Sequence, residues 1–113
     1  MVTNPFMTLE TSLRERIVSG KPDLVADLYL YPTKAGGKTK PIQLGYGCPC
    51  SASKDTSEAW DGYPLLNGEM MPGERRQVGF VFLSGLNAVD ALASGDSFYL
   101  WEGRFIGEAR IVR

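Results

Sequence analysis

The stretch FYLWEGRFIGEARIV, residues 98–112, decides the fold class of this chain. Apolar Phe98 and Leu100 alternate with larger amphipathic side chains, which is the period of a half-buried strand. A Gly-Arg pair then interrupts the pattern before a second alternating run begins. Glycine in a short connection between two such runs is typical of a β-hairpin. We therefore predict antiparallel strands over residues 97–102 and 105–112, joined by a tight turn.

Three segments earlier in the chain show the same period of two and predict further strands. They cover residues 23–31, 42–46 and 77–83, and the first of them ends at Pro32. Between the first two lies a basic loop with two adjacent glycines. The side chains expected to face the interior are Ala26, Leu28, Leu30, Val78, Phe80 and Phe82.

The N-terminal part has a helical period instead. Over residues 8–19 the apolar side chains recur every four positions, which predicts a short amphipathic helix. Thr8 is placed to cap its start, and Gly20 with Pro22 ends it. The stripe consists of Leu9, Leu13 and Ile17. We expect this helix to pack on the strands or cover an open end of the barrel, with a partner-binding helix as the alternative.

Short strands separated by Gly- and Pro-rich turns predict a sandwich or a barrel. We expect an all-β fold, a six-stranded antiparallel Greek-key barrel of translation-factor third-domain type, with a short N-terminal helix. Residues 1–22 would hold the helix and a linker, and residues 23–113 the barrel domain. The segment 86–93 is interpreted as a connection between strands, with room for one helical turn.

Composition restricts the chemistry. The chain has 113 residues, a formal net charge of −1 and no histidine. Lack of histidine excludes His-based triads, His general bases and His-ligated metal sites. The Gly-Lys-Thr at residues 37–39 lacks the upstream glycine of a phosphate-binding loop and leads into a predicted strand. We therefore expect no catalytic activity, no cofactor and no metal.

The only two cysteines, Cys48 and Cys50, form a C-P-C sequence. Two thiolates without histidine do not complete a zinc site, and a disulfide across one residue is strained. We expect buried thiols at the start of a strand, with a redox or metal pair as the alternative. Thiol catalysis, with Lys54 or Asp55 near the nucleophile, is a further hypothesis, which the lack of histidine disfavours.

Aromatic residues raise two questions about the surface. Trp60 and Tyr63 belong to a long polar segment, residues 51–64, and are either exposed contact residues or caps on the barrel end. Four further rings lie on strand faces opposite the predicted core: Tyr29, Tyr31, Tyr99 and Trp101. They form an aromatic surface if solvent faces them, or a second core if the N-terminal helix covers them. We favour the helix-covered arrangement.

Three segments together resemble the C-terminal β-barrel, the third domain, of elongation factor Tu and related translational GTPases. The loop at residues 34–40, followed by Pro41 and the pair Gly45 and Tyr46, is similar to the family's charged Gly-Gly loop with its Thr-Pro and Gly-Tyr. The family's E-M-V-M-P-G-D resembles EMMPGE at residues 69–74. Its closing R-E-G-G-R-T-V-G-A-G-V-V resembles WEGRFIGEARIV at the end of this chain.

The resemblance covers residues 23–112 and implies the barrel fold. In the family this barrel contacts the T-stem of aminoacyl-tRNA and helps bind the nucleotide exchange factor. No GTPase domain fits in 113 residues, and the family's R-P-Q-F is replaced here by GCPC at residues 47–50. The likeness at a contacting turn is confined to Glu102, Gly103 and Arg104.

These observations predict a non-catalytic binding module that recognises a protein partner, and the resemblance implies a partner linked to translation. The alternative is an RNA-binding barrel that contacts a structured RNA stem, although a net charge of −1 gives it no bulk electrostatic support. No apolar run approaches the roughly 20 residues of a membrane span, and no secretory signal starts the chain, so we expect cytoplasmic location. The predicted partner-binding residues are Lys34, Lys38, Lys40, Tyr46, Trp60, Tyr63, Glu102 and Arg104.

Overall fold

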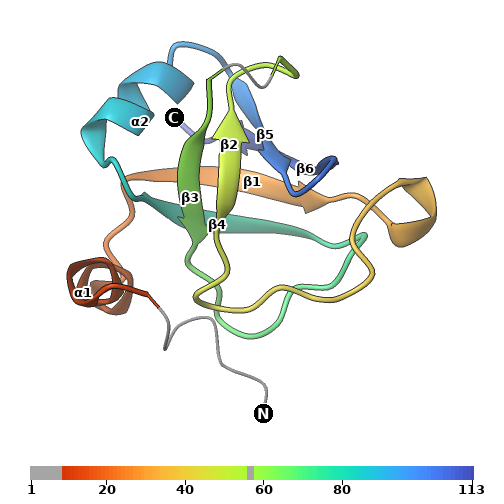
Figure 1. Cartoon of the computed structure of the whole chain (residues 1–113), viewed down its shortest axis with the longest axis horizontal. Helices are drawn as coiled ribbons and strands as arrows, with labels where there is room; N and C mark the ends of the chain where they lie inside the picture. Colours follow the sequence, from red (N-terminus) through yellow and green to blue (C-terminus); the bar gives the residue numbers. More distant parts are fainter. Residues whose placement is uncertain (1–8, 56–57) are drawn as a thin grey trace.

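A computed structural model describes residues 9–55 and 58–113. These residues form a closed barrel of six antiparallel strands, which confirms the predicted fold class (Figure 1). The described part also contains two α-helices and one 3-10 helix. The elements are α1 (Thr11–Ser19), β1 (Leu24–Leu30), η2 (Thr33–Ala35), β2 (Cys48–Ser51), β3 (Trp60–Pro64), β4 (Arg75–Phe82), α2 (Leu86–Leu92), β5 (Ser97–Trp101) and β6 (Phe105–Ile111).

The strand order around the barrel is β1-β4-β3-β2-β5-β6, and β6 closes the ring against β1. The consecutive strands β2, β3 and β4 are neighbours, while β1 lies beside β4. This arrangement of four strands is a Greek key. The connection from β1 to β2 therefore has to cross the barrel, which is why the long segment between them reaches the β5–β6 turn.

Alternating apolar side chains fill the interior, as the sequence predicts. Phe98 makes edge-to-face contacts with Phe80 and Phe82, at ring-centre distances of 5.1 and 6.0 Å. Such pairs add roughly 0.5–1.5 kcal/mol each to the free energy gained by burial. Further buried members of this core are Ala26, Leu28, Leu30, Ile42, Cys48, Cys50, Leu66, Met70, Val78, Leu100, Ile106 and Ala109.

Helix α1 packs on the outside of β4. Leu13 and Ile17 are buried against Val81, an outward-facing residue of that strand. Arg16 fixes the end of the helix by donating to the carbonyl of Phe82 at 2.7 Å and to the carboxylate of Asp23 at 3.0 Å. The predicted amphipathic helix is confirmed, and Gly20 ends it in the left-handed conformation. The predicted cap, Thr8, lies outside the described residues.

The predicted return strand at residues 42–46 is wrong. Only Ile42 pairs there, in an isolated bridge with Met70. Pro41 has no N–H to donate, and Gly45 adopts a left-handed φ of 101°. The amide of Tyr46 donates to the carbonyl of residue 43, so the chain turns instead of extending.

The interpretation of residues 51–64 as one long loop is also wrong in its second half. Trp60–Pro64 is strand β3, paired with both β2 and β4. The hairpin partner β2 begins at Cys48, as expected for thiols at a strand start. Polar composition hid this strand, because its outward positions are Asp61 and Tyr63 and an inward position is Gly62. A Cβ on Gly62 would lie 2.7 Å from the ring of a core phenylalanine, so the missing side chain makes room for the core.

The segment predicted to connect strands at residues 86–93 contains a seven-residue helix, α2. Ala88 and Leu92 of α2 are fully buried and join the barrel core. The segment does link β4 to β5, but it also contributes to the interior. Among the described residues, no helix is long and apolar enough to cross a membrane.

The expectation that the N-terminal helix covers the outward aromatic rings is wrong. Figure 1 shows α1 at the lower left beside β4, whereas the loop that follows β1 lies at the right. Leu13 and Ile17 contact Val81 and not the rings of β1 and β5. The four rings lie on β1, directly after it and on β5, and they are half-buried on the outer side of the barrel: Tyr29, Tyr31, Tyr99 and Trp101.

Candidate functional site

The loop after β1 and the turn between β5 and β6 meet at one edge of the barrel. The ammonium group of Lys38 is 2.5 Å from a carboxylate oxygen of Glu102. The hydroxyl of Tyr46 donates to the other oxygen of that carboxylate at 2.8 Å. Residues 64 positions apart in sequence are therefore joined directly. We call the set Lys34, Lys38, Lys40, Tyr46, Glu102 and Arg104 the loop–turn surface.

The charges of Lys38 and Glu102 stabilise one another. Burial alone would raise the pKa of Glu102, but the hydrogen bonds from Lys38 and Tyr46 outweigh it and hold that pKa below its ordinary value. The Lys38 ammonium also lies 5.1 Å from the centre of the Tyr46 ring, a cation–π contact. Burial, followed by the proximity of Cys48 and Glu102, raises the pKa of Tyr46, so its phenol stays protonated.

Gly37 allows this close approach of the loop to the barrel. A Cβ at this position would lie 1.9 Å from the carbonyl oxygen of Tyr31, so no other residue fits without moving the backbone. The carbonyl of Gly37 accepts from the guanidinium of Arg104 at 3.3 Å. The loop is thus held on both sides, by the hydrogen bond from the Gly37 amide to the Pro32 carbonyl at 3.0 Å and by Arg104 of the β5–β6 turn.

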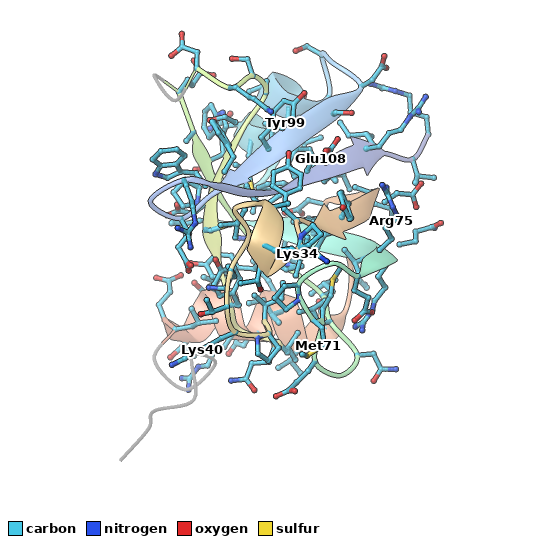
Figure 2. All side chains as sticks on the ribbon, turned by 90° about the vertical axis from the view of Figure 1, so that its right-hand side faces the viewer. Lys34, Lys40, Met71, Arg75, Tyr99 and Glu108 are labelled. Atoms are coloured by element: carbon cyan, nitrogen blue, oxygen red, sulfur yellow. The ribbon has the colours of Figure 1, made fainter. Side chains whose placement is uncertain are left out.

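Lys34 and Lys40 are exposed members of the loop–turn surface. Figure 2 shows both on the face of the molecule that also carries Arg75, Tyr99 and Glu108. Exposed cations beside a fixed loop can recognise a carboxylate or a phosphate. Lys34 and Lys40 thus add two exposed cations beside the Lys38–Glu102 pair.

Two predicted site residues lie elsewhere. Tyr63 packs between α1 and the barrel, and its ring lies so close to Gly47 that a Cβ there would be 2.1 Å away. Burial raises the pKa of Tyr63. Trp60 pairs with Cys50 across the β2–β3 ladder and packs on the barrel core. Neither residue adjoins the Lys38–Glu102 pair, and both contribute to packing.

The outward rings form a second feature, which we call the tyrosine face: Tyr29, Tyr31, Tyr99, Trp101 and Phe105. Phe105 contacts both Tyr99 and Trp101 edge to face, at 6.1 and 5.1 Å between ring centres. Tyr31 contacts Tyr29 in the same manner at 5.7 Å. Tyr31 precedes the basic loop and Trp101 precedes the β5–β6 turn, so this face is continuous with the loop–turn surface.

Sequence reasoning missed the charged residues of the tyrosine face. The guanidinium of Arg75 stacks 3.9 Å from the centre of the Tyr29 ring, and the ammonium of Lys54 is 5.4 Å from that of Tyr99. Glu108 lies between the two tyrosines in the strand register. Burial, and then the charge of Glu108, raise the pKa of Tyr31 to about 12. Period-two counting places Arg75 and Glu108 on the outer face, but only the register brings them into one row with the tyrosines, and Lys54 reaches Tyr99 from the segment after β2.

The cysteine pair lies inside the barrel. Cys48 and Cys50 are free thiols, buried in the apolar core. The hydrogen bond to Cys48 and burial raise the pKa of Cys50, which disfavours the thiolate that nucleophilic catalysis needs. Lys54, which the thiol-catalysis hypothesis places near the nucleophile, lies over Tyr99 on the outer side. Within the part of the chain that the structure describes, no group of three or more Cys, Asp or Glu side chains is placed to hold a metal ion.

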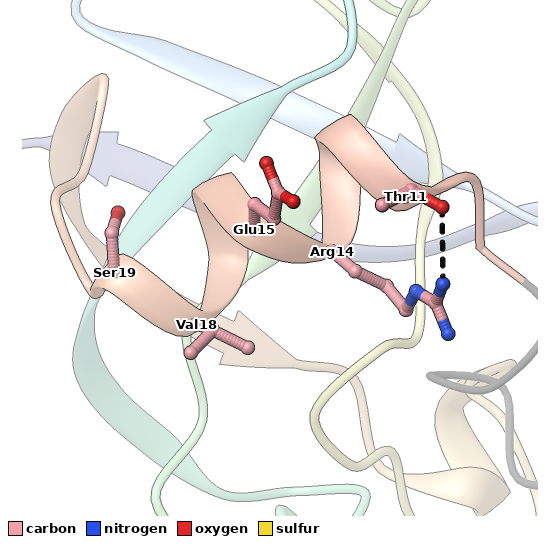
Figure 3. A pocket seen from close by; sticks show the side chains of 5 residues that line it. All are labelled: Thr11, Arg14, Glu15, Val18 and Ser19. Atoms are coloured by element: carbon pink, nitrogen blue, oxygen red, sulfur yellow. Dashed lines mark hydrogen bonds between the residues drawn. The ribbon is translucent and has the colours of Figure 1, made fainter.

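A hollow of about 540 Å³ lies along the outer side of α1 (Figure 3). It is lined by Thr11, Arg14, Glu15, Val18 and Ser19. All five belong to one helix, and Arg14 donates to Thr11 within it at 3.2 Å. This hollow is larger than the one beside Asp27 and Arg75, yet no polar groups from a second element converge on it. We therefore give the contacts of the loop–turn surface more weight than the size of this hollow.

No family model matches this chain, and no curated protein matches it either. Its function must therefore be inferred from its own residues. The loop–turn surface and the tyrosine face are the features that offer chemistry to a partner.

Proposed function

We propose that this protein is a non-catalytic binding module whose partner is another protein, contacted through the loop–turn surface. The observation that supports this most is the Lys38–Glu102–Tyr46 contact, which joins two distant segments into one preorganised surface. Preorganisation lowers the entropic cost of association. The barrel interior is filled with apolar side chains, so the chemistry available to a ligand lies outside.

A link to translation is the finer part of this proposal. It rests on the resemblance of residues 23–112 to the third domain of elongation factor Tu. A chain of this kind could compete with that domain for a shared partner. The structural support is limited to the barrel class, which many unrelated functions use.

The test is affinity capture of the tagged, full-length protein from lysate of its own cells, with and without ribonuclease. Lys34→Glu combined with Lys40→Glu is the informative variant, because both side chains are exposed. Lys38→Glu is unsuitable, since it would set a second carboxylate against Glu102. Arg14→Glu with Lys21→Glu is the matched control, with the same charge change on the α1 side.

A stoichiometric protein that survives ribonuclease, is retained by the control and is lost by the Lys34/Lys40 variant is the expected result. Equal capture by the two variants would remove the loop–turn surface from the proposal. Recovery that disappears with ribonuclease would favour RNA, the alternative suggested by the basic side chains Lys34, Lys40 and Arg104. In that case the logarithm of affinity for an RNA stem should fall steeply with the logarithm of salt, by roughly 0.9 per neutralised phosphate on a duplex.

A further inference from the structure

The tyrosine face has a pattern of charge that the proposed function does not use. One row of outward residues crosses four neighbouring strands: Arg75 on β4, Tyr29 on β1, Glu108 on β6 and Tyr99 on β5. Arg75 stacks on the first tyrosine and Lys54 lies over the second. The row therefore has a cation at each end, an aromatic ring beside each cation and one carboxylate in the middle.

The neighbouring row contributes little net charge. Asp27 on β1 lies opposite Arg110 on β6, so these two exposed charges offset one another. Lys34 adds a further cation on the same side of the molecule, as Figure 2 shows. The flanks thus carry the cations Arg75, Lys54 and Lys34, with Asp55 next to Lys54 in sequence, although the whole chain has a net charge of −1. The charge of the face is complementary to a ligand with separated negative groups.

The spacing of the row limits the ligand further. Neighbouring strands lie about 4.8 Å apart, so the backbones of Tyr29 and Tyr99 are separated by roughly 10 Å along the sheet and their cations by somewhat more. An extended peptide rises about 3.3 Å per residue, so two carboxylates four residues apart would span the cations. The residue between them would face Glu108 and the rings, which favours an uncharged apolar side chain there.

Single-stranded nucleic acid fits this face less well. Base stacking needs an open ring face, and Arg75 already covers that of Tyr29 at 3.9 Å. A nucleic-acid strand also carries a phosphate at every nucleotide, so it would have to pass the carboxylate of Glu108 with its charges in place. A peptide can place a neutral residue at that point. Tyr, Trp, Phe and Arg are the side chains enriched in protein interfaces.

We propose that the tyrosine face binds an extended acidic segment of a protein partner, with two carboxylates about four residues apart held by Arg75 and Lys54. The inference rests on the proposed function, because it specifies what part of a protein partner this barrel recognises. It adds a surface next to the loop–turn surface and does not depend on Lys34 or Lys40 being the main contact.

The test uses the whole chain labelled with ¹⁵N and three synthetic nine-residue peptides. The first has glutamate at its third and seventh positions, leucine at the fifth and serine elsewhere. The second has glutamine in place of both glutamates, and the third has glutamate in place of the leucine. Amide shifts are followed up to millimolar peptide, and a uridine oligonucleotide of equal length is titrated separately.

We expect the first peptide to shift the amides of Tyr29, Tyr99 and Glu108, and the other two peptides to bind more weakly. Arg75→Gln and Lys54→Gln should each weaken binding at least about tenfold, the effect of losing a charge-assisted hydrogen bond. Lys21→Gln, which alters an exposed lysine just after α1, should leave the affinity for the first peptide unchanged. A melting curve for each variant separates loss of binding from loss of folding.

Three results would overturn the inference. One is that the first and second peptides bind equally; another is that no amide of the row shifts. Tighter binding of the oligonucleotide to the same row would assign the face to nucleic acid instead. The peptide titration is independent of the capture of a protein through Lys34 and Lys40. Failure of the acidic-segment proposal is therefore distinguishable from failure of the proposed function.

Discussion

The two outer sides of this barrel have the same strand periodicity but different surroundings. On the side of β4, the outward residue Val81 is aliphatic and is buried beneath Leu13 and Ile17 of α1. On the side of β1, β5 and β6, the outward rings Tyr29 and Tyr99 flank Glu108, and Arg75 at the start of β4 stacks on Tyr29. The comparison teaches that an outward apolar residue serves packing where a helix covers it. Where no helix covers it, the same kind of position carries a half-buried ring on which charged side chains stack.

The largest expected effect is on the α1 side. Ile17→Ala removes side-chain atoms from a residue that is 3% exposed, and should lower the free energy of unfolding by about 2–5 kcal/mol. Val18→Ala, on the same helix and 69% exposed, is the control and should change it by no more than about 0.5 kcal/mol. Urea denaturation followed by circular dichroism measures both. Equal losses would mean that α1 does not pack on β4 as described.

A second effect on the same side comes from close backbone approach. Gly47→Ala would bring a Cβ to 2.1 Å from the ring of Tyr63, so the ring or the strand must move. Overpacking of this kind costs about 1–3 kcal/mol. Gly95→Ala, where the nearest atom to a new Cβ is 3.9 Å away, is the matched control. A Gly47→Ala protein with the stability of the control would show that Tyr63 moves away at no cost.

The tyrosine face should respond to alkali. Burial and Glu108 raise the pKa of Tyr31 to about 12, whereas the unfolded chain ionises this phenol near its ordinary value of 10.0. Between these values the folded state binds more protons, so the free energy of unfolding falls as pH rises. Ultraviolet titration of the wild type and of Tyr31→Phe gives the ionisation of the Tyr31 phenol as the difference between the two curves. This difference should develop at a higher pH than the ionisation of a tyrosine in an unfolded chain. Ionisation of the Tyr31 phenol at pH 10 in the folded protein would contradict the described environment.

The smallest effect concerns the loop–turn surface next to that face. The lowered pKa of Glu102 means that its ionised form stabilises the fold above the ordinary value of 4.5, and that this contribution is lost as pH falls through the folded pKa. Glu102→Gln should therefore be less stable than wild type at pH 7, by under about 1 kcal/mol because the carboxylate is partly exposed. The gap should close in acid. A gap that is constant from pH 7 to pH 3 would exclude the ionised pair as its cause.

The core, strand β3 and the N-terminal helix show how much of the fold the sequence predicts. Alternation placed Phe80, Phe82 and Phe98 in the interior, and the structure confirms it. Strand β3 was missed because Gly62 and Asp61 break the apolar pattern. The helix was placed on the wrong side of the barrel, because an amphipathic stripe shows which face of a helix is buried but not against which strand.

Six of the eight predicted partner-binding residues form the loop–turn surface at one edge of the barrel. The other two, Trp60 and Tyr63, lie elsewhere. Lys38 and Glu102 meet because the β1–β2 connection crosses the barrel to reach the β5–β6 turn. Trp60 and Tyr63 were expected on a loop, and strand pairing places them in the packing of the core and of α1. Whether the grouped residues bind a partner stays a prediction.

The sequence by itself determined the all-β class, the short helix and the inward faces of β1, β4 and β5, because these depend on side-chain period and on local Gly and Pro conformations. Only the tertiary structure decided the strand order and the register. These depend on which segments pair over long sequence separations, and side-chain alternation shows which face of a strand is buried but not which distant strand it pairs with. The row Arg75, Tyr29, Glu108 and Tyr99 exists only through that register, and so does the contact of Lys38 with Glu102.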